Sequence, residues 1–337
     1  MDKEVINICY AADENYAMQA GVSICSVLEH NREERFHFWI LCDNYSEKTR
    51  KKFSEIENLY DTKVDLIDVT SKLIQLKESS LYVPEAVDKR GLITFMYARL
   101  FIGSLLPRYV SRLIYIDCDT YINGKIGPLF DFPLIKIVGA VIDLYPSLYN
   151  KIIGFSKDDK YYNSGVLLID MDKWRNVEIE KQICNHISSL KKTYYMHDQD
   201  ILNVVLKTEI EPLPLMYNMM YISRAYNAGQ ILKFSEKTQS TYYDNQSIEN
   251  AKKAPIIIHY AGDYFGKPWD FPKSNDYALM WEHIFLKSPW KNEKCRILSK
   301  KIIVKQRLHE ILEPVIHDYW LGRTYRRFVN EIRNINK

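Results

Sequence analysis

The sequence lacks the cysteine patterns that build zinc sites and disulfide frameworks. Its cysteines are scattered along the chain and none of them forms a C-x-x-C pair, so neither kind of site is indicated. Reduced thiols in the core of a cytosolic protein explain this usage better. The six positions are Cys9, Cys25, Cys42, Cys118, Cys184 and Cys295.

Long apolar runs are also missing, and the first residues do not read as a signal peptide. No segment approaches the roughly 18 uninterrupted apolar residues of a membrane span, and the most apolar helix-like segment is interrupted by Arg99. The first ten residues, MDKEVINICY, contain acidic side chains and enter a strand-like pattern at once, which is unlike a signal peptide. We therefore expect a cytoplasmic protein.

Glycine-rich phosphate loops are absent as well. No G-x-G-x-x-G follows the first predicted strand, which disfavours a dinucleotide cofactor, and no G-x-x-x-x-G-K-[ST] is present. The net charge of +3 is small but unevenly placed: residues 291–337 hold an excess of seven positive charges, so residues 1–290 carry about −4. Nucleic-acid binding would rest on this tail alone, and we do not expect it.

Residues 1–122 alternate between strand-like and helix-like patterns. Continuous apolar runs such as VINICYAA and FHFWILC are typical of strands covered on both faces, and helical spacing follows them, including a helix over 92–106 that Pro107 ends. The order β-α-β-α-β-α-β, with RLIYID as the fourth strand, predicts an open parallel sheet of Rossmann type.

The rhythm changes after residue 122. IVGAVID, YYNSGVLLID and APIIIHYAG read as further strands of the same sheet, with helices over 177–190 and 199–207 and a flexible loop over 235–250. No linker is apparent, so residues 1–290 are predicted to form one domain with halves 1–122 and 123–290. Residues 291–337 are predicted to form a basic helical extension.

The stretch RLIYIDCDTYI, residues 112–122, ends a buried strand with two carboxylates. Side chains at i and i+2 of a strand point to the same side, so Asp117 and Asp119 can reach one ligand. Ligands of open α/β sheets bind beyond the carboxyl ends of the strands, and two carboxylates there suit Mg²⁺ or Mn²⁺. A D-x-D taken alone is more often a strand ending in a polar turn.

Four other segments carry candidate polar groups. Asp13 and Asn15 lie at the first β-to-α turn, where nucleotides bind, although helix capping is the simpler explanation when the segment is taken alone. His259 follows a buried strand and precedes Lys267; it is a candidate third metal ligand or an ordinary core histidine. HDQDIL and YYNSGVLLID are rich in polar groups that could bind hydroxyls. The alternative is that these groups are ordinary polar side chains on the surface around a core element.

Together these segments resemble one family, the retaining glycosyltransferases of family eight. The resemblance rests on AADENY, YARL, YIDCDT, NSGVLLID, HDQDILN and HYAG...KPW, in that order, over residues 6–290. The family adopts the GT-A fold, and it includes glycogenin and bacterial lipopolysaccharide and lipooligosaccharide galactosyl- and glucosyltransferases. The resemblance therefore implies a GT-A catalytic domain, with a Rossmann-like nucleotide-binding sheet extended by mixed strands.

The resemblance also assigns roles. Contacts to uridine are implied for the backbone of Ala11 and for Asp13 and Asn15. Asp117, Asp119 and His259 match the ligands of Mn²⁺ on the UDP diphosphate. Gly262 and Lys267 match the phosphate-binding end, although this chain has four residues, 263–266, between the glycine and KPW, more than the family usually has. Contacts to the donor hexose are implied for Arg99, Asp143, Asn163, Asp198 and Gln199.

The implied activity is metal-dependent transfer of glucose or galactose, with retention, from a UDP-sugar to a glycan or glycolipid acceptor of the cell envelope. Gln199 is expected to orient and stabilise rather than to attack, because an amide is a poor nucleophile. The alternatives are a noncatalytic nucleotide-sugar binder and a different metal-dependent nucleotidyl- or phosphotransferase. For the basic tail, a peripheral membrane contact and a helical extension packed on the protein are about equally expected.

Overall fold

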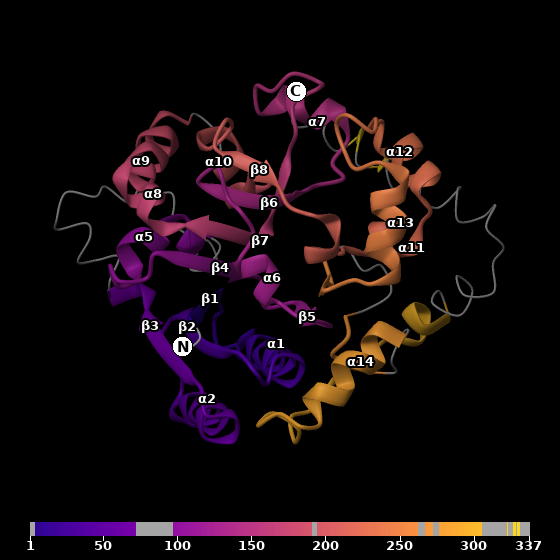
Figure 1. Cartoon of the computed structure of the whole chain (residues 1–337). Helices are drawn as coiled ribbons and strands as arrows, with labels where there is room; N and C mark the ends of the chain where they lie inside the picture. Colours follow the sequence, from indigo (N-terminus) through magenta and orange to yellow (C-terminus); the bar gives the residue numbers. More distant parts are fainter. Residues whose placement is uncertain are drawn as a thin grey trace.

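The computed structural model describes residues 4–71, 97–190, 194–261, 267–271 and 276–304, and a few residues between 322 and 330. It shows an α/β fold around one seven-stranded sheet of order β3-β2-β1-β4-β7-β6-β8. In Figure 1 the helices α1 (Ala17–His30) and α2 (Glu47–Tyr60) lie on one side of this sheet, and α8 (Met171–Asn176) and α9 (Ile179–Ser189) lie on the other.

The first half of the sheet is parallel, as predicted. β1 (Val5–Ala11) lies between β2 (Arg35–Cys42) and β4 (Arg112–Ile116), and β3 (Lys63–Asp68) pairs with β2. The inner residues of β1, β2 and β4 are almost all buried, which explains their uninterrupted apolar runs. This order, 3-2-1-4, is that of a Rossmann-type half sheet.

The second half makes the sheet mixed. β7 (Tyr162–Asp170) is antiparallel to β4, β6 (Val138–Ile142) is antiparallel to β7, and β8 (Ile210–Pro212) is parallel to β6. β7 is buried along nearly its whole length. It therefore joins the two halves through one continuous core, and the prediction of a Rossmann-like sheet extended by mixed strands is confirmed.

One strand does not lie where we expected. The segment APIIIHYAG was predicted to join the main sheet, but β9 (Ile257–His259) pairs with β5 (Thr120–Ile122) in a separate two-stranded antiparallel sheet. The prediction was wrong because both edges of β4 are taken, one by β1 and the other by β7. β9 pairs instead with the strand that follows the D-x-D turn.

The predicted helices are confirmed to within a few residues. The pattern over 177–190 corresponds to α9, and that over 199–207 to α10 (His197–Val205). In the segment predicted over 92–106, residues 97–105 are helical, including η2 (Arg99–Phe101) and α5 (Ile102–Leu105), and the remainder before residue 97 lies outside the described residues.

The loop predicted over 235–250 is only partly a loop. Its second half begins α13 (Asn245–Lys253), because the Asp244 carboxylate accepts a hydrogen bond from the Ser247 backbone N–H at 2.7 Å and caps the helix. Within the first half, Thr241 and Tyr242 are buried. The polar residues that indicated a loop around Asp244 are instead those that begin and cap α13.

The remaining short elements complete the second half and the C-terminal part. They are α6 (Gly127–Phe130), α7 (Ser147–Ile152), η3 (Leu215–Tyr217), α11 (Tyr221–Ala225), α12 (Ala228–Ser235), β10 (Asp270–Phe271), α14 (Asp276–Phe285) and β11 (Arg296–Ile297).

After α14 the chain returns to the domain, where β11 pairs with β10. Most of the basic extension lies outside the described residues, so its helical structure stays a prediction. In the described part of the chain, no helix has both the length and the apolar character needed to cross a membrane.

Candidate functional site

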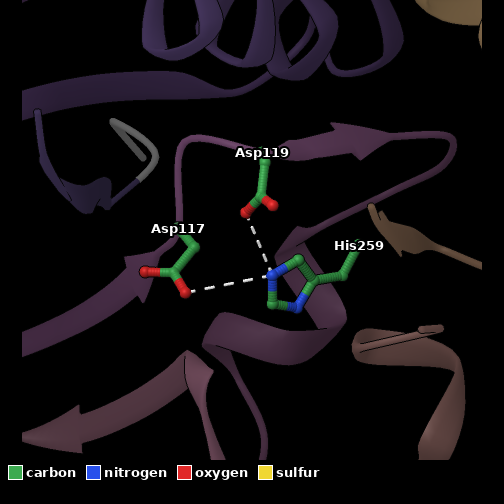
Figure 2. A group of neighbouring side chains, drawn as sticks. All are labelled: Asp117, Asp119 and His259. Carbon is green, nitrogen blue, oxygen red and sulfur yellow. Dashed lines mark hydrogen bonds and ion pairs between the residues drawn. The ribbon is translucent and has the colours of Figure 1, made fainter. Parts of the chain in front are cut away.

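Two carboxylates and one imidazole meet at the carboxyl end of β4 (Figure 2). Asp117 follows β4, Asp119 precedes β5, and His259 is the last residue of β9. Because Thr120 and His259 are partners in the β5–β9 sheet, the imidazole is brought to the D-x-D turn by strand pairing. Nε2 of His259 lies 3.1 Å from Oδ1 of Asp119 and 3.9 Å from Oδ2 of Asp117.

The donor set of this cluster fits a divalent cation. The candidate ligand atoms all lie within 4.8 Å of one another. Carboxylate oxygens suit Mg²⁺ and Mn²⁺, and the imidazole nitrogen favours Mn²⁺ as the softer of the two. Three protein ligands also leave coordination positions for oxygens of a substrate. The predicted metal-ligand residues are therefore brought together by the fold.

A chain of amide groups fixes the imidazole tautomer. The Gly165 backbone N–H donates to Oδ1 of Asn163 at 2.9 Å, so this amide oxygen is identified by an unambiguous donor. Nδ2 of Asn218 donates to the same oxygen at 2.8 Å, which leaves Oδ1 of Asn218 to accept from Nδ1 of His259 at 2.9 Å. Nε2 of His259 therefore faces the two aspartates: in the protonated ring it donates to Asp119, and in the neutral ring it would offer its lone pair to a cation.

Gly165 leaves space for this arrangement. A Cβ atom at this position would lie 2.4 Å from Cε1 of His259 and 2.8 Å from Oδ2 of Asp117. The Gly165 backbone carbonyl also accepts the Asp117 backbone N–H at 2.8 Å. Any side chain on residue 165 would displace a candidate metal ligand.

Two cations balance the charge of the aspartates. Nζ of Lys267 lies 3.0 Å from Oδ2 of Asp119. Burial opposes ionisation of Asp119, but the charges of His259 and Lys267 outweigh it and hold the pKa of this carboxyl well below its usual range. In the same way, burial opposes protonation of His259, but the Asp119 carboxylate raises the pKa of the imidazole.

Arg99 connects the metal-ligand cluster to the HDQDIL segment. Its Nη2 lies 2.9 Å from Oδ1 of Asp117, its Nε lies 2.9 Å from Oδ2 of Asp198, and Nη1 donates to the Ser164 carbonyl at 2.8 Å. One guanidinium thus serves two carboxylates. Burial, reinforced by Asp117 and opposed by Arg99, raises the pKa of Asp198 to about 6.

The other predicted hexose contacts form one buried network beside Arg99. Oδ2 of Asp143 accepts hydrogen bonds from Nδ2 of Asn163 at 2.9 Å and from Nε2 of Gln199 at 3.1 Å. Oε1 of Gln199 accepts the Ser164 backbone N–H at 3.0 Å, which identifies it as the oxygen. Nε2 of Gln199 also contacts the Tyr161 hydroxyl at 3.0 Å. The structure therefore brings all five predicted hexose residues together.

The predicted uridine contacts lie at the end of β1. The Ala11 carbonyl accepts the Cys118 thiol at 3.1 Å, so the first turn lies against the D-x-D turn. Asp13 is partly exposed. Oδ1 of its carboxylate accepts a hydrogen bond from the Tyr16 backbone N–H at 3.0 Å, and Oδ2 accepts one from Nδ2 of Asn15 at 3.2 Å. Asp13 therefore closes the turn before α1, but the N-cap of α1 is Tyr16, so neither Asp13 nor Asn15 caps the helix as the alternative expected. Gly262 lies outside the described residues.

Sequence reasoning missed several residues of this site. Tyr161, Ser164 and Asp200 lie inside the quoted motifs, where their roles were hidden by more obvious polar neighbours; the Asp200 carboxylate accepts the Tyr161 hydroxyl at 2.7 Å. Asn218 lies outside every motif, in the segment LPLMYNMM. No sequence pattern marks Asn218, and its role is visible only in the fold, where it forms hydrogen bonds with both Asn163 and His259.

Known proteins share this fold and this sequence pattern. The structure matches a crystal structure of galactosyltransferase LgtC in complex with donor and acceptor sugar analogs, with a TM-score of 0.67 and 24% identity over 89% of this chain and 100% of that one. It also matches the apo structure of the bifunctional glycosyltransferase WbbM, with a TM-score of 0.66 and 20% identity over 91% of this chain and 52% of that one. These likenesses show that the fold is of the GT-A type.

Among curated proteins, a lipopolysaccharide 1,2-glucosyltransferase of Escherichia coli (strain K12) is 28% identical over 95% of this chain and 88% of its own length. General stress protein A of Bacillus subtilis (strain 168) is 25% identical over 85% of this chain and 95% of its own. The model of the family described as glycosyl transferase family 8 matches residues 7–272. The chain thus belongs to glycosyl transferase family 8.

Proposed function

We propose that this protein is a metal-dependent, retaining hexosyltransferase that moves glucose or galactose from a UDP-sugar to a glycan or glycolipid acceptor of the cell envelope. The observation that carries this is the meeting of Asp117, Asp119 and His259 beside the buried network of Asp143 and Gln199. Family membership supports glycosyl transfer, and the name of the Escherichia coli relative supports a glucose donor and a lipopolysaccharide acceptor.

The protein groups account for the departure of the diphosphate. A divalent cation held by Asp117, Asp119 and His259 would supply Lewis-acid stabilisation of the leaving group. Lys267, paired to Asp119, adds a positive charge at the same place. In this proposal the nucleoside and the phosphates are held by the backbone of Ala11, by Asp13 and Asn15, and by Gly262.

The groups on the other side of Arg99 account for the sugar. Asp198, at 2.9 Å from the guanidinium, provides negative charge near a developing oxocarbenium ion. Asp143 supplies a fixed acceptor for a hexose hydroxyl, and Asn163 holds this carboxylate in place through a hydrogen bond of 2.9 Å. Because Arg99 contacts both Asp117 and Asp198, it fixes the position of the candidate metal ligand relative to the carboxylate on the sugar side.

Gln199 is assigned an orienting role. Its carbonyl oxygen accepts hydrogen bonds from the Ser164 backbone N–H and from Nδ2 of Asn163, at 3.0 and 3.2 Å. An amide oxygen has two lone pairs, so in this arrangement none remains to attack the anomeric carbon. Retention is then best explained by attack of the acceptor on the face that the diphosphate leaves, with a diphosphate oxygen taking the acceptor proton.

The test measures the binding of UDP by calorimetry, with and without Mn²⁺. Asp117→Ala and Asp119→Ala should each abolish sugar transfer and remove the Mn²⁺-dependent part of UDP binding. The exposed Asp158→Ala is the matched control and should bind as the wild type does. Unchanged metal-dependent binding in both site variants would show that the ligand assignment is wrong.

A UDP-release assay with UDP-glucose and UDP-galactose addresses the alternatives. A noncatalytic nucleotide-sugar binder would bind either donor and release no UDP.

The proposal also includes three features of the whole protein. They are the division into halves 1–122 and 123–290, a cytoplasmic location, and a peripheral membrane contact through residues 291–337.

A further inference from the structure

Lys237 is a buried lysine to which neither the sequence motifs nor the proposed mechanism gives a role. It follows the C-terminal end of α12, and its side chain is only 4% exposed. Among the described residues, its ammonium group has no hydrogen-bond partner. A buried ammonium normally has a hydrogen-bonding or charged partner, since removing it from water is costly otherwise. An unpaired one therefore indicates a partner that arrives with a ligand.

The ammonium group belongs to the sugar side of the site. The segment that follows Lys237 packs on the end of β6, where the Tyr243 hydroxyl accepts the Ile142 backbone N–H at 3.1 Å and donates to the Leu213 carbonyl at 2.6 Å. Asp143 is the next residue after Ile142. Burial lowers the pKa of Lys237, and the charge of Asp143 opposes this shift, so the two groups lie within each other's electric field.

The two groups nevertheless make no ion pair in the described part of the chain. Oδ2 of Asp143 already accepts hydrogen bonds from Asn163 and Gln199, whereas Oδ1 accepts only the Leu144 backbone N–H, at 2.6 Å. A carboxylate oxygen can accept two hydrogen bonds. Among the described residues, one acceptor position on Asp143 and the donors of the Lys237 ammonium group therefore have no partner.

The chemistry of this pair selects a hydroxyl group. An ammonium group only donates hydrogen bonds and a carboxylate only accepts them, while a hydroxyl does both. A phosphate or carboxylate ligand would be attracted by Lys237 but repelled by Asp143 at the same place. An apolar group would leave the ammonium group unpaired. A sugar hydroxyl satisfies both partners at once.

We propose that Lys237 is a specificity-determining residue that binds one hydroxyl group of the transferred hexose together with Asp143. Nζ donates a hydrogen bond to the hydroxyl oxygen, and the hydroxyl donates to the carboxylate. This rests on the proposed function, because it takes the hexose to be the sugar of the nucleotide donor. A site that hydrogen-bonds one hydroxyl from two sides disfavours a donor that lacks or inverts it.

The first experiment compares Lys237→Met with the wild type. Methionine keeps the length of the side chain and removes the ammonium group. We expect UDP to bind unchanged in the presence of Mn²⁺, and UDP-glucose or UDP-galactose to bind about tenfold more weakly. The melting temperature without ligand should rise, because an unpaired buried charge is removed. Lys233→Met, at an exposed position of α12, is the matched control and should change none of these.

The second experiment identifies the hydroxyl. Donors that lack the 2-, 3-, 4- or 6-hydroxyl of the hexose are titrated against both proteins. One of them should bind the wild type about tenfold more weakly than the parent donor does, and Lys237→Met should bind that donor and the parent equally. The coupling between one ligand group and one side chain is the signature of a direct contact.

Three results would overturn the inference. Equal donor affinity of Lys237→Met and the wild type would show that the lysine does not contact the hexose. A lower melting temperature or weaker UDP binding of Lys237→Met would show a structural role. Wild-type protein that binds UDP but gains nothing from an attached hexose would refute the donor assignment itself, and this failure is seen without any variant.

Discussion

At the scale of single residues, the site depends on a missing side chain as much as on those present. Gly165 lies where a Cβ atom would meet both His259 and Asp117. Its backbone also participates, because its N–H orients Asn163 and its carbonyl accepts the Asp117 N–H. The imidazole and the carboxylate can therefore face a common point only when residue 165 has no side chain.

Gly165→Ala tests this directly. The added methyl group should push His259 and Asp117 apart, so that Mn²⁺-dependent UDP binding weakens at least about tenfold, with a loss of roughly 1–3 kcal/mol in the free energy of unfolding from overpacking. Gly229→Ala is the control: its Cβ would meet the nearest atom at an ordinary 3.4 Å inside α12, where alanine favours the helix. Equal UDP binding by both variants would contradict the steric argument. Binding is measured by calorimetry and unfolding with urea.

At the scale of elements, a buried tryptophan helps to attach the segment after α14 to the first half of the domain. Trp290 is buried against α1 and α2, with its ring 5.1 Å from that of Phe53 and Nζ of Lys52 5.3 Å from its centre. Gly21 on α1 makes room for this ring, because a Cβ there would lie 2.1 Å from it. Helix α1 therefore carries glycine where it receives the tryptophan.

A double-mutant cycle tests this contact. Trp290→Ala should lower the free energy of unfolding by about 3–5 kcal/mol, and Gly21→Ala should also destabilise the protein by displacing the ring. In the Trp290→Ala background, however, Gly21→Ala should be neutral or stabilising, since alanine gains up to about 1 kcal/mol of helix propensity. Additive effects in urea unfolding would refute the direct contact. Glu293→Gln, which removes the ion pairs of Glu293 with the exposed Lys48 and the mostly buried Lys52, should cost no more than about 1 kcal/mol.

At the scale of the whole molecule, the buried carboxyl group of Asp198 lowers stability in a pH-dependent way. Asp198 has a pKa of about 6 in the folded protein, chiefly because it is buried, and a carboxyl of the unfolded chain has a pKa near 4. Between these values the folded state binds more protons than the unfolded state. The contribution of this group to the free energy of unfolding therefore falls as pH rises from about 4 to about 6.

Asp198→Asn should remove this dependence. The stability of the wild type relative to the variant should decrease by roughly 2 kcal/mol between pH 4 and pH 6 and stay level above that range. Urea unfolding at several pH values, with no metal or nucleotide added, provides the measurement. A difference that is constant across this range would show that the pKa of Asp198 is not raised.

The sequence predicted those parts of the molecule that depend on local pattern. The parallel half of the sheet follows from continuous apolar runs, and the metal-ligand candidates follow from carboxylates at a strand end. The place of β9 was not predictable, because its pairing with β5 joins residues some 140 positions apart in a pattern that suits the main sheet equally well. Asn218 and Lys237 were missed for a related reason: the role of each depends on what lies beside it in space.

The pairing of β5 with β9 also bears on how such enzymes can be recombined. The D-x-D turn comes from the first half of the chain and His259 comes from the far end of the second, and backbone hydrogen bonds between the two strands hold them together. A chimera that joins the first 122 residues of one enzyme to the remainder of another would inherit an untested strand interface at its candidate metal site. Donor preference is therefore better transferred by exchanging individual side chains, such as that of Lys237, than by exchanging whole segments.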